Sequence, residues 1–115
     1  MIIARAFAGK HYAVLGLARS GLATVEALIS SGAFVTAWDQ DSEARERTAD
    51  AVTDLLPQLD NAYLYFADLD FADLTQFDSI VVTPGLPLNR HPIAARARAA
   101  GVEIIGDIEI GRAHV

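Results

Sequence analysis

The residues best suited to chemistry lie in a short turn that begins and ends with glycine. The turn follows the apolar run 12–15 and leads into an alanine- and leucine-rich stretch, a pattern typical of strand, tight turn and helix. In such a turn the first N–H groups of the helix point at one place, and the helix dipole adds partial positive charge there. We therefore predict a phosphate-binding seat. Its residues are Gly16, Leu17, Ala18, Arg19, Ser20 and Gly21.

The turn departs from the dinucleotide fingerprint G-x-G-x-x-G, because Ala18 stands where the middle glycine belongs. Its methyl group adds bulk where a pyrophosphate comes closest to the backbone. This difference argues against the binding of NAD or FAD, but it does not argue against the binding of a phosphate. A plain strand-to-helix turn with incidental glycines is the alternative.

Asp39 is the second candidate, because it ends the predicted strand 34–38 about twenty residues after Gly16. Nucleotide-binding α/β domains place at this position the acidic group that meets a ribose or a base. The following residues, Gln40, Asp41 and Glu43, lead into a predicted helix, and acidic residues there can equally serve as caps. We predict a ligand role for Asp39 and leave both roles open for Asp41 and Glu43.

A third candidate is the loop Thr83-Pro84-Gly85, which directly follows the predicted buried strand 79–82. In an open α/β sheet such a loop overhangs the carboxyl ends of the strands, so it faces the same crevice as the glycine turn. The alternative is a stiff connector. His91, which precedes Pro92, is interpreted as the entrance of a helix.

Several aspartates gather between residues 68 and 78, but they lack the spacing and the central glycine of a calcium loop. We interpret them as a solvated acidic face and predict no metal site. They are Asp68, Asp70, Asp73 and Asp78.

The elements that must position these residues alternate between strand and helix. Strands are predicted at 12–15, 34–38, 63–66, 79–82 and 102–105, helices at 20–30, 42–56 and 93–100, and a short helical or turn connection at 71–74. Ser20 is a possible N-cap of the first helix. Right-handed crossovers then give an α/β fold, a Rossmann-like doubly wound parallel five-stranded sheet with strand order 3-2-1-4-5.

Composition narrows the class of protein. The chain has 115 residues, enough for one domain with its own core, and no cysteine, which excludes disulfides and thiolate zinc sites. A net charge of −6 argues against non-specific binding to nucleic acid. The sequence shows neither an apolar run of membrane-spanning length nor a signal peptide, so we expect a cytoplasmic protein without a membrane partner.

Three segments together resemble one family. The stretch 14–21, the loop 83–87 with its continuation to His91-Pro92, and the segment 101–109 are similar to the N-terminal domain of the Mur ligases. The similarity extends over nearly the whole chain. The glycine turn is moderately specific for the family, and the other two segments are more so.

The resemblance implies a Rossmann-like domain, spanning residues 1–115, that holds the UDP moiety of UDP-N-acetylmuramoyl-L-alanine. It further implies that the remaining ligase domains, absent from this chain, bind ATP and Mg²⁺ and receive D-glutamate. The substrate carboxylate is phosphorylated to an acyl phosphate, which the amine then attacks. Because the chain has no G-x-x-x-x-G-K-[ST] segment, we expect it to need no cofactor of its own and to bind substrate without turnover.

Position by position, Arg19 and Ser20 match the residues whose backbone N–H groups meet the diphosphate. The residues Asp39, Gln40 and Asp41 match a cluster near the uridine, and Gly85 matches a residue lining the uracil pocket. Some members have a basic residue where Asp41 stands, so an arginine contact to uracil is missing or replaced in this chain.

Two other functions remain open from the sequence. One is an NAD(P)-type regulatory or redox module that uses Asp39 for an adenosine ribose, which Ala18 disfavours. The other is an interaction domain whose pocket binds no nucleotide.

Overall fold

The structure is a computed structural model that describes residues 9–53, 63–82 and 92–106. Its elements in chain order are β1 (His11–Leu15), α1 (Arg19–Ser30), β2 (Phe34–Trp38), α2 (Ser42–Thr53), β3 (Tyr63–Phe66), the 3₁₀ helix η3 (Leu74–Gln76), β4 (Ser79–Val82), α3 (Pro92–Ala100) and β5 (Glu103–Gly106). Strand and helix alternate as the sequence predicts.

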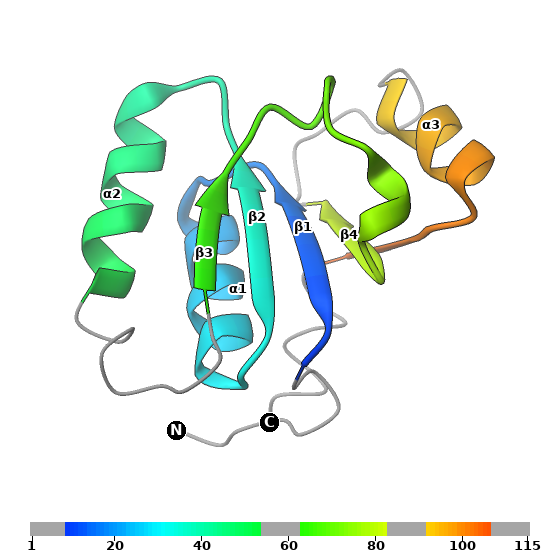
Figure 1. Cartoon of the computed structure of the whole chain (residues 1–115). Helices are drawn as coiled ribbons and strands as arrows, with labels where there is room; N and C mark the ends of the chain where they lie inside the picture. The colour runs from blue at the N-terminus through cyan, green and yellow to red at the C-terminus, as the bar shows by residue number, and fades with distance from the viewer. Residues whose placement is uncertain (1–8, 54–62, 83–91, 107–115) are drawn as a thin grey trace.

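The strands form one parallel five-stranded sheet in the order β3-β2-β1-β4-β5, which confirms the predicted topology (Figure 1). In the ladders, Leu15 lies opposite Trp38 on one side and opposite Val82 on the other. The three central strands therefore end in one row. Whatever follows these strands lies at the same edge of the sheet, where open α/β folds bind their ligands.

One face of the sheet is covered by α1 and α2. Figure 1 shows α1 lying behind β2 and β3. Successive side chains of a strand point to opposite faces of the sheet, so every second side chain of β1 and β2 points into this core. The buried side chains of this core are Tyr12, Val14, Leu17, Val25, Leu28, Ile29, Ala33, Val35, Ala37, Ala44, Val52 and Val81.

The opposite face carries η3 and α3, which pack over β1 and β4. In Figure 1, α3 lies on the β4 side of the sheet. The buried side chains of this second core are Ala13, Leu15, Leu69, Leu74, Phe77, Ile80, Ile93 and Ala97. A sheet covered on both faces explains why the strands read as continuous apolar runs.

Helix α2 contacts the core through a narrow stripe of buried residues. Its buried residues, Ala44, Thr48 and Val52, recur every fourth position, and the Thr48 hydroxyl donates to the Ala44 carbonyl at 2.9 Å. This spacing places them on one side of the helix. The predicted continuation of the helix to residue 56 lies outside the described residues.

Some boundaries differ from those predicted. Helix α1 begins at Arg19, and the N-cap is Ala18, so the prediction of Ser20 as N-cap was wrong. Strand β5 begins at Glu103, one residue later than expected. The short helix after β3 begins at Leu74, because the Asp73 carboxylate caps it by accepting from the Thr75 N–H at 3.0 Å. None of the helices in the described ranges has the length and apolarity needed to cross a bilayer.

His11 lies at the amino end of β1, away from the edge where the strands end. Its Nε2 is 2.9 Å from the Thr36 hydroxyl oxygen, and its ring meets Phe77 edge-on with centroids 4.7 Å apart. Its backbone exchanges two hydrogen bonds with Asp78, each 2.8 Å long. Burial lowers the pKa of His11 from 6.5, and the nearby Asp78 carboxylate opposes this shift without reversing it.

We predict that His11 makes stability fall in mild acid. Because the folded state binds the His11 proton less readily than the unfolded state, its contribution is complete above pH 6.5. That contribution is lost as the pH falls below this value towards the lower folded-state pKa. Urea unfolding at pH 7.5 and 5.5 measures the change, and His11→Gln should show a smaller loss of unfolding free energy than the unaltered chain. An equal loss in both proteins would contradict the assignment.

Candidate functional site

The glycine turn joins β1 to α1 at the edge where the strands end. Gly16 has φ +96°, a conformation that residues with a Cβ rarely adopt, and its N–H donates to the Trp38 carbonyl at 2.9 Å. This bond extends the pairing of β1 and β2 by one residue. The backbone then turns through Leu17, which is buried, and Ala18, which is exposed.

Helix α1 begins without a side-chain cap. The N-cap, Ala18, has extended backbone angles and makes no side-chain cap hydrogen bond, and the first turn holds no acidic residue. The first hydrogen bond within the helix runs from the Leu22 N–H to the Ala18 carbonyl at 2.9 Å. The N–H groups that precede it have no carbonyl partner within the helix and can bind an anion.

Asp39 ties the turn to the end of β2. One carboxylate oxygen accepts from the Leu17 N–H at 2.8 Å and the other from the Asp41 N–H at 2.9 Å. The bond to Leu17 is partly buried, which limits competition from bulk water, whereas the bond to Asp41 is exposed. Asp39 therefore has a structural role in shaping the turn, and its ligand role stays a prediction.

Asp41 caps α2. Its carboxylate accepts from the Glu43 N–H at 3.0 Å, so the capping role that the sequence left open is confirmed for this residue. The side chain is exposed at the start of the helix. A contact of Asp41 with uridine stays a prediction.

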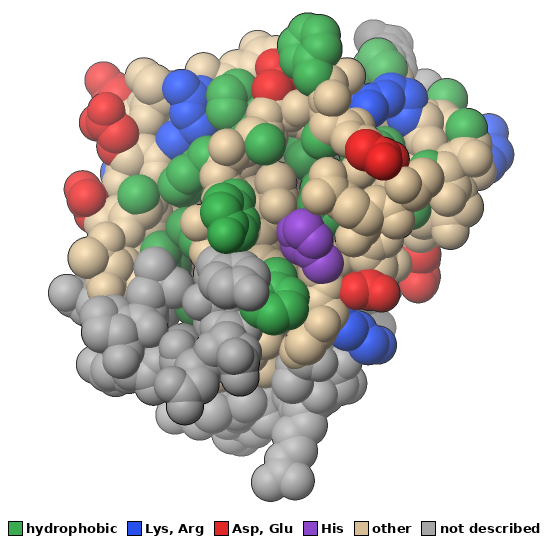
Figure 2. All heavy atoms as spheres, viewed as in Figure 1, with side chains coloured by type: hydrophobic (Ala, Val, Ile, Leu, Met, Phe, Trp, Pro, Cys, Tyr) green, Lys and Arg blue, Asp and Glu red, His purple; other side chains and the backbone are tan. Residues whose placement is uncertain are grey.

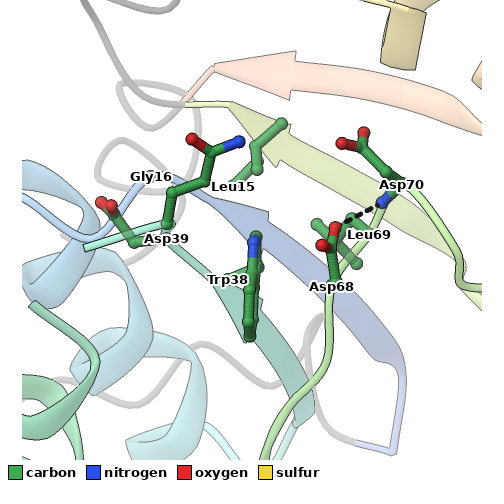
Figure 3. Close-up of a pocket in the computed structure, with 8 residues that line it drawn as sticks. Leu15, Gly16, Trp38, Asp39, Asp68, Leu69 and Asp70 are labelled. Carbon is green, nitrogen blue, oxygen red and sulfur yellow. Dashed lines mark hydrogen bonds between the residues drawn. The ribbon is translucent and has the colours of Figure 1, made fainter. Parts of the chain in front are cut away.

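A pocket of about 330 Å³ opens beside the turn at the ends of β1, β2 and β3 (Figure 3). Figure 3 shows Leu15 and Trp38 from two neighbouring strands, with Asp68 and Asp70 on the chain that follows β3. Apolar surface from strand ends and polar groups at the rim suit a partly apolar, hydrogen-bonding ligand. The lining residues are Leu15, Gly16, Trp38, Asp39, Gln40, Asp68, Leu69 and Asp70.

Arg45 supports the β2 side of this pocket. Its guanidinium carbon lies 4.4 Å from the centroid of the Trp38 ring, and Nη1 donates to the Asp39 carbonyl at 2.6 Å and to the Gln40 carbonyl at 3.3 Å. The stacking and the hydrogen bonds hold the end of β2 against α2. Sequence reasoning missed Arg45, which looks like one of several charged residues on an exposed helix.

Sequence reasoning also missed the pocket residues after β3. The sequence indicated a solvated acidic face for Asp68 and Asp70. Asp70 is indeed exposed, but both residues line the pocket. Leu69, between them, is almost completely buried. The sequence could have indicated these two residues, because they follow a predicted strand and the carboxyl ends of neighbouring parallel strands meet at one edge of the sheet. Among the described residues, no three acidic or histidine side chains gather closely enough to hold a metal ion.

The predicted site residues thus separate into groups. Gly16, Asp39 and Gln40 line the pocket, and the stretch from Leu17 to Gly21 forms the turn and the first turn of α1 beside it. Arg19 is exposed. The predicted loop residues Thr83, Pro84 and Gly85 lie outside the described residues.

Positive charge at the site is local. Figure 2 shows acidic and basic side chains interspersed over the face drawn in Figure 1, with apolar side chains exposed between them. Because the chain carries a net charge of −6, no general positive field attracts an anion. Backbone N–H groups and the dipole of α1 are the features suited to that task.

Comparison with known proteins assigns the chain to a family. The family model for the Mur ligase MurD-like N-terminal domain matches residues 10–106. The chain belongs to this family. The match includes the glycine turn, Asp39 and every described strand, so the elements that form the site are those of a MurD-like N-terminal domain.

Two similar relatives share one protein name. UDP-N-acetylmuramoylalanine--D-glutamate ligase of Sphingopyxis alaskensis is 57% identical over 110 residues, which cover 96% of this chain and 23% of the relative. The ligase of that name from Novosphingobium aromaticivorans is 56% identical, over 96% of this chain and 22% of its own length. The MurD-like domain described here therefore spans about a quarter of the length of these relatives.

Solved structures share the fold. Shikimate dehydrogenase of Mycobacterium tuberculosis superimposes on 92% of this chain and 48% of its own chain, with a TM-score of 0.57 and 19% identity. A shikimate 5-dehydrogenase of Mycobacterium fortuitum gives a TM-score of 0.52 at 20% identity. At this level of identity the likeness concerns the fold alone.

Proposed function

We propose that this chain is the UDP-binding domain of a ligase that adds D-glutamate to UDP-N-acetylmuramoyl-L-alanine in peptidoglycan precursor synthesis. The observation that carries the proposal is the uncapped start of α1 beside a pocket, in a chain that is 57% identical over 110 residues to the D-glutamate ligase of Sphingopyxis alaskensis. A diphosphate needs hydrogen-bond donors, and a nucleoside needs a partly apolar cleft next to them.

In this proposal the diphosphate lies at the N-terminus of α1. The backbone N–H groups of Arg19, Ser20 and Gly21 donate to its oxygens, and the helix dipole stabilises its charge. The missing side-chain cap leaves these donors to the ligand. The methyl group of Ala18 is exposed at the same place and limits how closely the backbone can approach.

The uridine occupies the pocket beside the turn. Asp39 and Gln40 provide acceptors and donors at its rim, and Leu15 and Trp38 provide apolar contact for the base. The family resemblance implies that Gly85 lines the uracil pocket, and we assign Thr83 and Pro84 of the same loop to substrate binding; all three lie outside the described residues. Asp41 lies next to the rim but already caps α2, so we assign it a secondary part in binding.

The bond-forming chemistry belongs to the rest of the ligase. ATP, held with Mg²⁺ by a central domain, phosphorylates the substrate carboxylate, and the amine of D-glutamate displaces phosphate from the acyl phosphate. The role of this domain is to hold the UDP end so that the carboxylate reaches that centre, which lowers the entropic cost of the reaction. The chain alone is expected to bind in the cytoplasm without catalysing the reaction.

Titration of the isotope-labelled 115-residue chain tests this proposal. UDP, UDP-N-acetylmuramoyl-L-alanine and NAD are added separately while backbone amide NMR shifts are followed. We expect saturable shifts at Ser20, Gly21, Asp39 and Gly85 with both uridine ligands. Shifts with NAD alone would favour the dinucleotide-binding module, and silence with all three ligands would favour an interaction domain without a nucleotide site.

A further inference from the structure

The two walls of the pocket are built differently. One wall is the end of β2, which is fixed by the sheet and by Asp39. The other wall is the chain after β3, where Asp68 and Asp70 line the pocket. At the start of this segment the Ala67 N–H still donates to the Ala37 carbonyl of β2, at 3.3 Å. The second wall leaves the sheet at this point and needs support from elsewhere.

Local bonds give the second wall its shape. The Asp68 carboxylate accepts from the Asp70 N–H at 2.9 Å, as the dashed line in Figure 3 marks, and the Asp68 carbonyl accepts from the Phe71 N–H at 3.1 Å. These bonds form a compact turn. They do not fix its position over the pocket, because each joins residues of the turn to one another.

Arg96 of α3 fixes the position of this turn over the pocket. Its Nη1 donates to the Leu69 carbonyl and its Nη2 to the Ala72 carbonyl, the latter at 2.7 Å. The guanidinium thus spans the turn with two bonds from a planar fork whose geometry is rigid. Leu69 is almost completely buried in the core that α3 also enters through Ile93 and Ala97, so side chain and backbone are held by the same helix.

The arrangement mirrors that of Arg45 on the first wall. Each arginine reaches from a helix to two backbone carbonyls of one pocket wall, Arg45 from α2 and Arg96 from α3. Neither arginine is placed to bind the ligand with these N–H groups, because carbonyl oxygens already occupy them. Their effect on a ligand must act through the walls.

We propose that Arg96 is a positioning residue for the nucleoside end of the site, holding Asp68 and Asp70 where their carboxylates can accept from ribose hydroxyl or base N–H donors. The proposal rests on the proposed UDP-binding function. It adds the turn after β3 as the second wall of the nucleoside pocket. It also separates this end from the diphosphate seat at α1, because the bonds of Arg96 go to the turn after β3.

The test compares Arg96→Gln with Arg98→Gln, an exposed arginine on the same helix. Dissociation constants are measured by NMR titration for UDP and for inorganic pyrophosphate, which uses the diphosphate seat alone. We expect Arg96→Gln to raise the Kd for UDP about tenfold, the scale of a lost charge-assisted hydrogen bond. The Kd for pyrophosphate should stay unchanged, and Arg98→Gln should leave both constants unchanged.

Arg96→Lys provides a second variant that retains the charge and can keep one of the two carbonyl bonds. Its Kd for UDP should lie between those of the unaltered chain and Arg96→Gln. An unchanged UDP affinity in both Arg96 variants, or equal weakening of UDP and pyrophosphate, would overturn the positioning role while leaving UDP binding intact. Failure of the unaltered chain to bind UDP would overturn the proposed function itself, and the role of Arg96 with it.

Discussion

Replacing Asp39 with alanine is expected to weaken UDP binding about a hundredfold and to lower the unfolding free energy by about 2–3 kcal/mol. The carboxylate accepts from the Leu17 and Asp41 N–H groups, so its removal leaves the partly buried Leu17 N–H without this partner and removes one of the bonds that tie the glycine turn to the end of β2. The loss of binding should exceed the loss expected from unfolding alone. Calorimetric titration with UDP and urea unfolding measure the two effects.

Asp50→Ala is the matched control, since Asp50 is exposed on α2. It should change neither quantity. Asp39→Asn should give intermediate values, because its single amide oxygen can accept where the carboxylate had two acceptors. A destabilised Asp39→Ala protein that still binds UDP with unchanged affinity would reduce Asp39 to a structural residue.

Replacing Gly16 with alanine is expected to raise the Kd for UDP at least about tenfold. An L-residue at φ +96° costs about 1–2 kcal/mol, and relaxation of that strain moves the Leu17 N–H away from Asp39 and the start of α1 away from the ligand. UDP titration of the variant at a temperature where it is fully folded measures the change.

Gly101→Ala separates strain from function. Gly101 has φ +73°, a Cβ there would meet nothing within 4 Å, and the residue precedes β5, so it lies at the edge of the sheet opposite the pocket. The Gly101→Ala variant should lose about as much unfolding free energy as Gly16→Ala and keep the UDP affinity of the unaltered chain. If both variants bind UDP equally well, the glycine turn is not the diphosphate seat.

The order of the strands could be predicted because it depends on short, local patterns. The runs at β1 and β4 are apolar without alternation, which indicates strands buried on both faces, and Gly32 and Gly101 end the helices that separate strands. Right-handed crossovers then leave few arrangements. The same reasoning placed Gly16 and Asp39 at one edge of the sheet.

The contacts that shape the site could not be predicted in the same way. Arg45 and Arg96 have long side chains with many rotamers, and sequence does not reveal which carbonyls the guanidinium groups reach. The role of Asp39 in bonding to Leu17 depends on a distance across two strand ends. Helix α1 begins one residue before the predicted start, and its N-cap, Ala18, offers no capping group, which no preference scale favours.

The Arg45–Trp38 stack has a practical consequence. Trp38 is the only tryptophan in the chain, it lines the pocket, and a guanidinium lies over its ring. Indole emission depends on the polarity and charge around the ring, so the tryptophan fluorescence of this chain, excited selectively over that of its three tyrosines, comes from one side chain at the candidate site. Occupancy of the pocket can thus be followed optically, without a label and without altering any residue that holds the ligand.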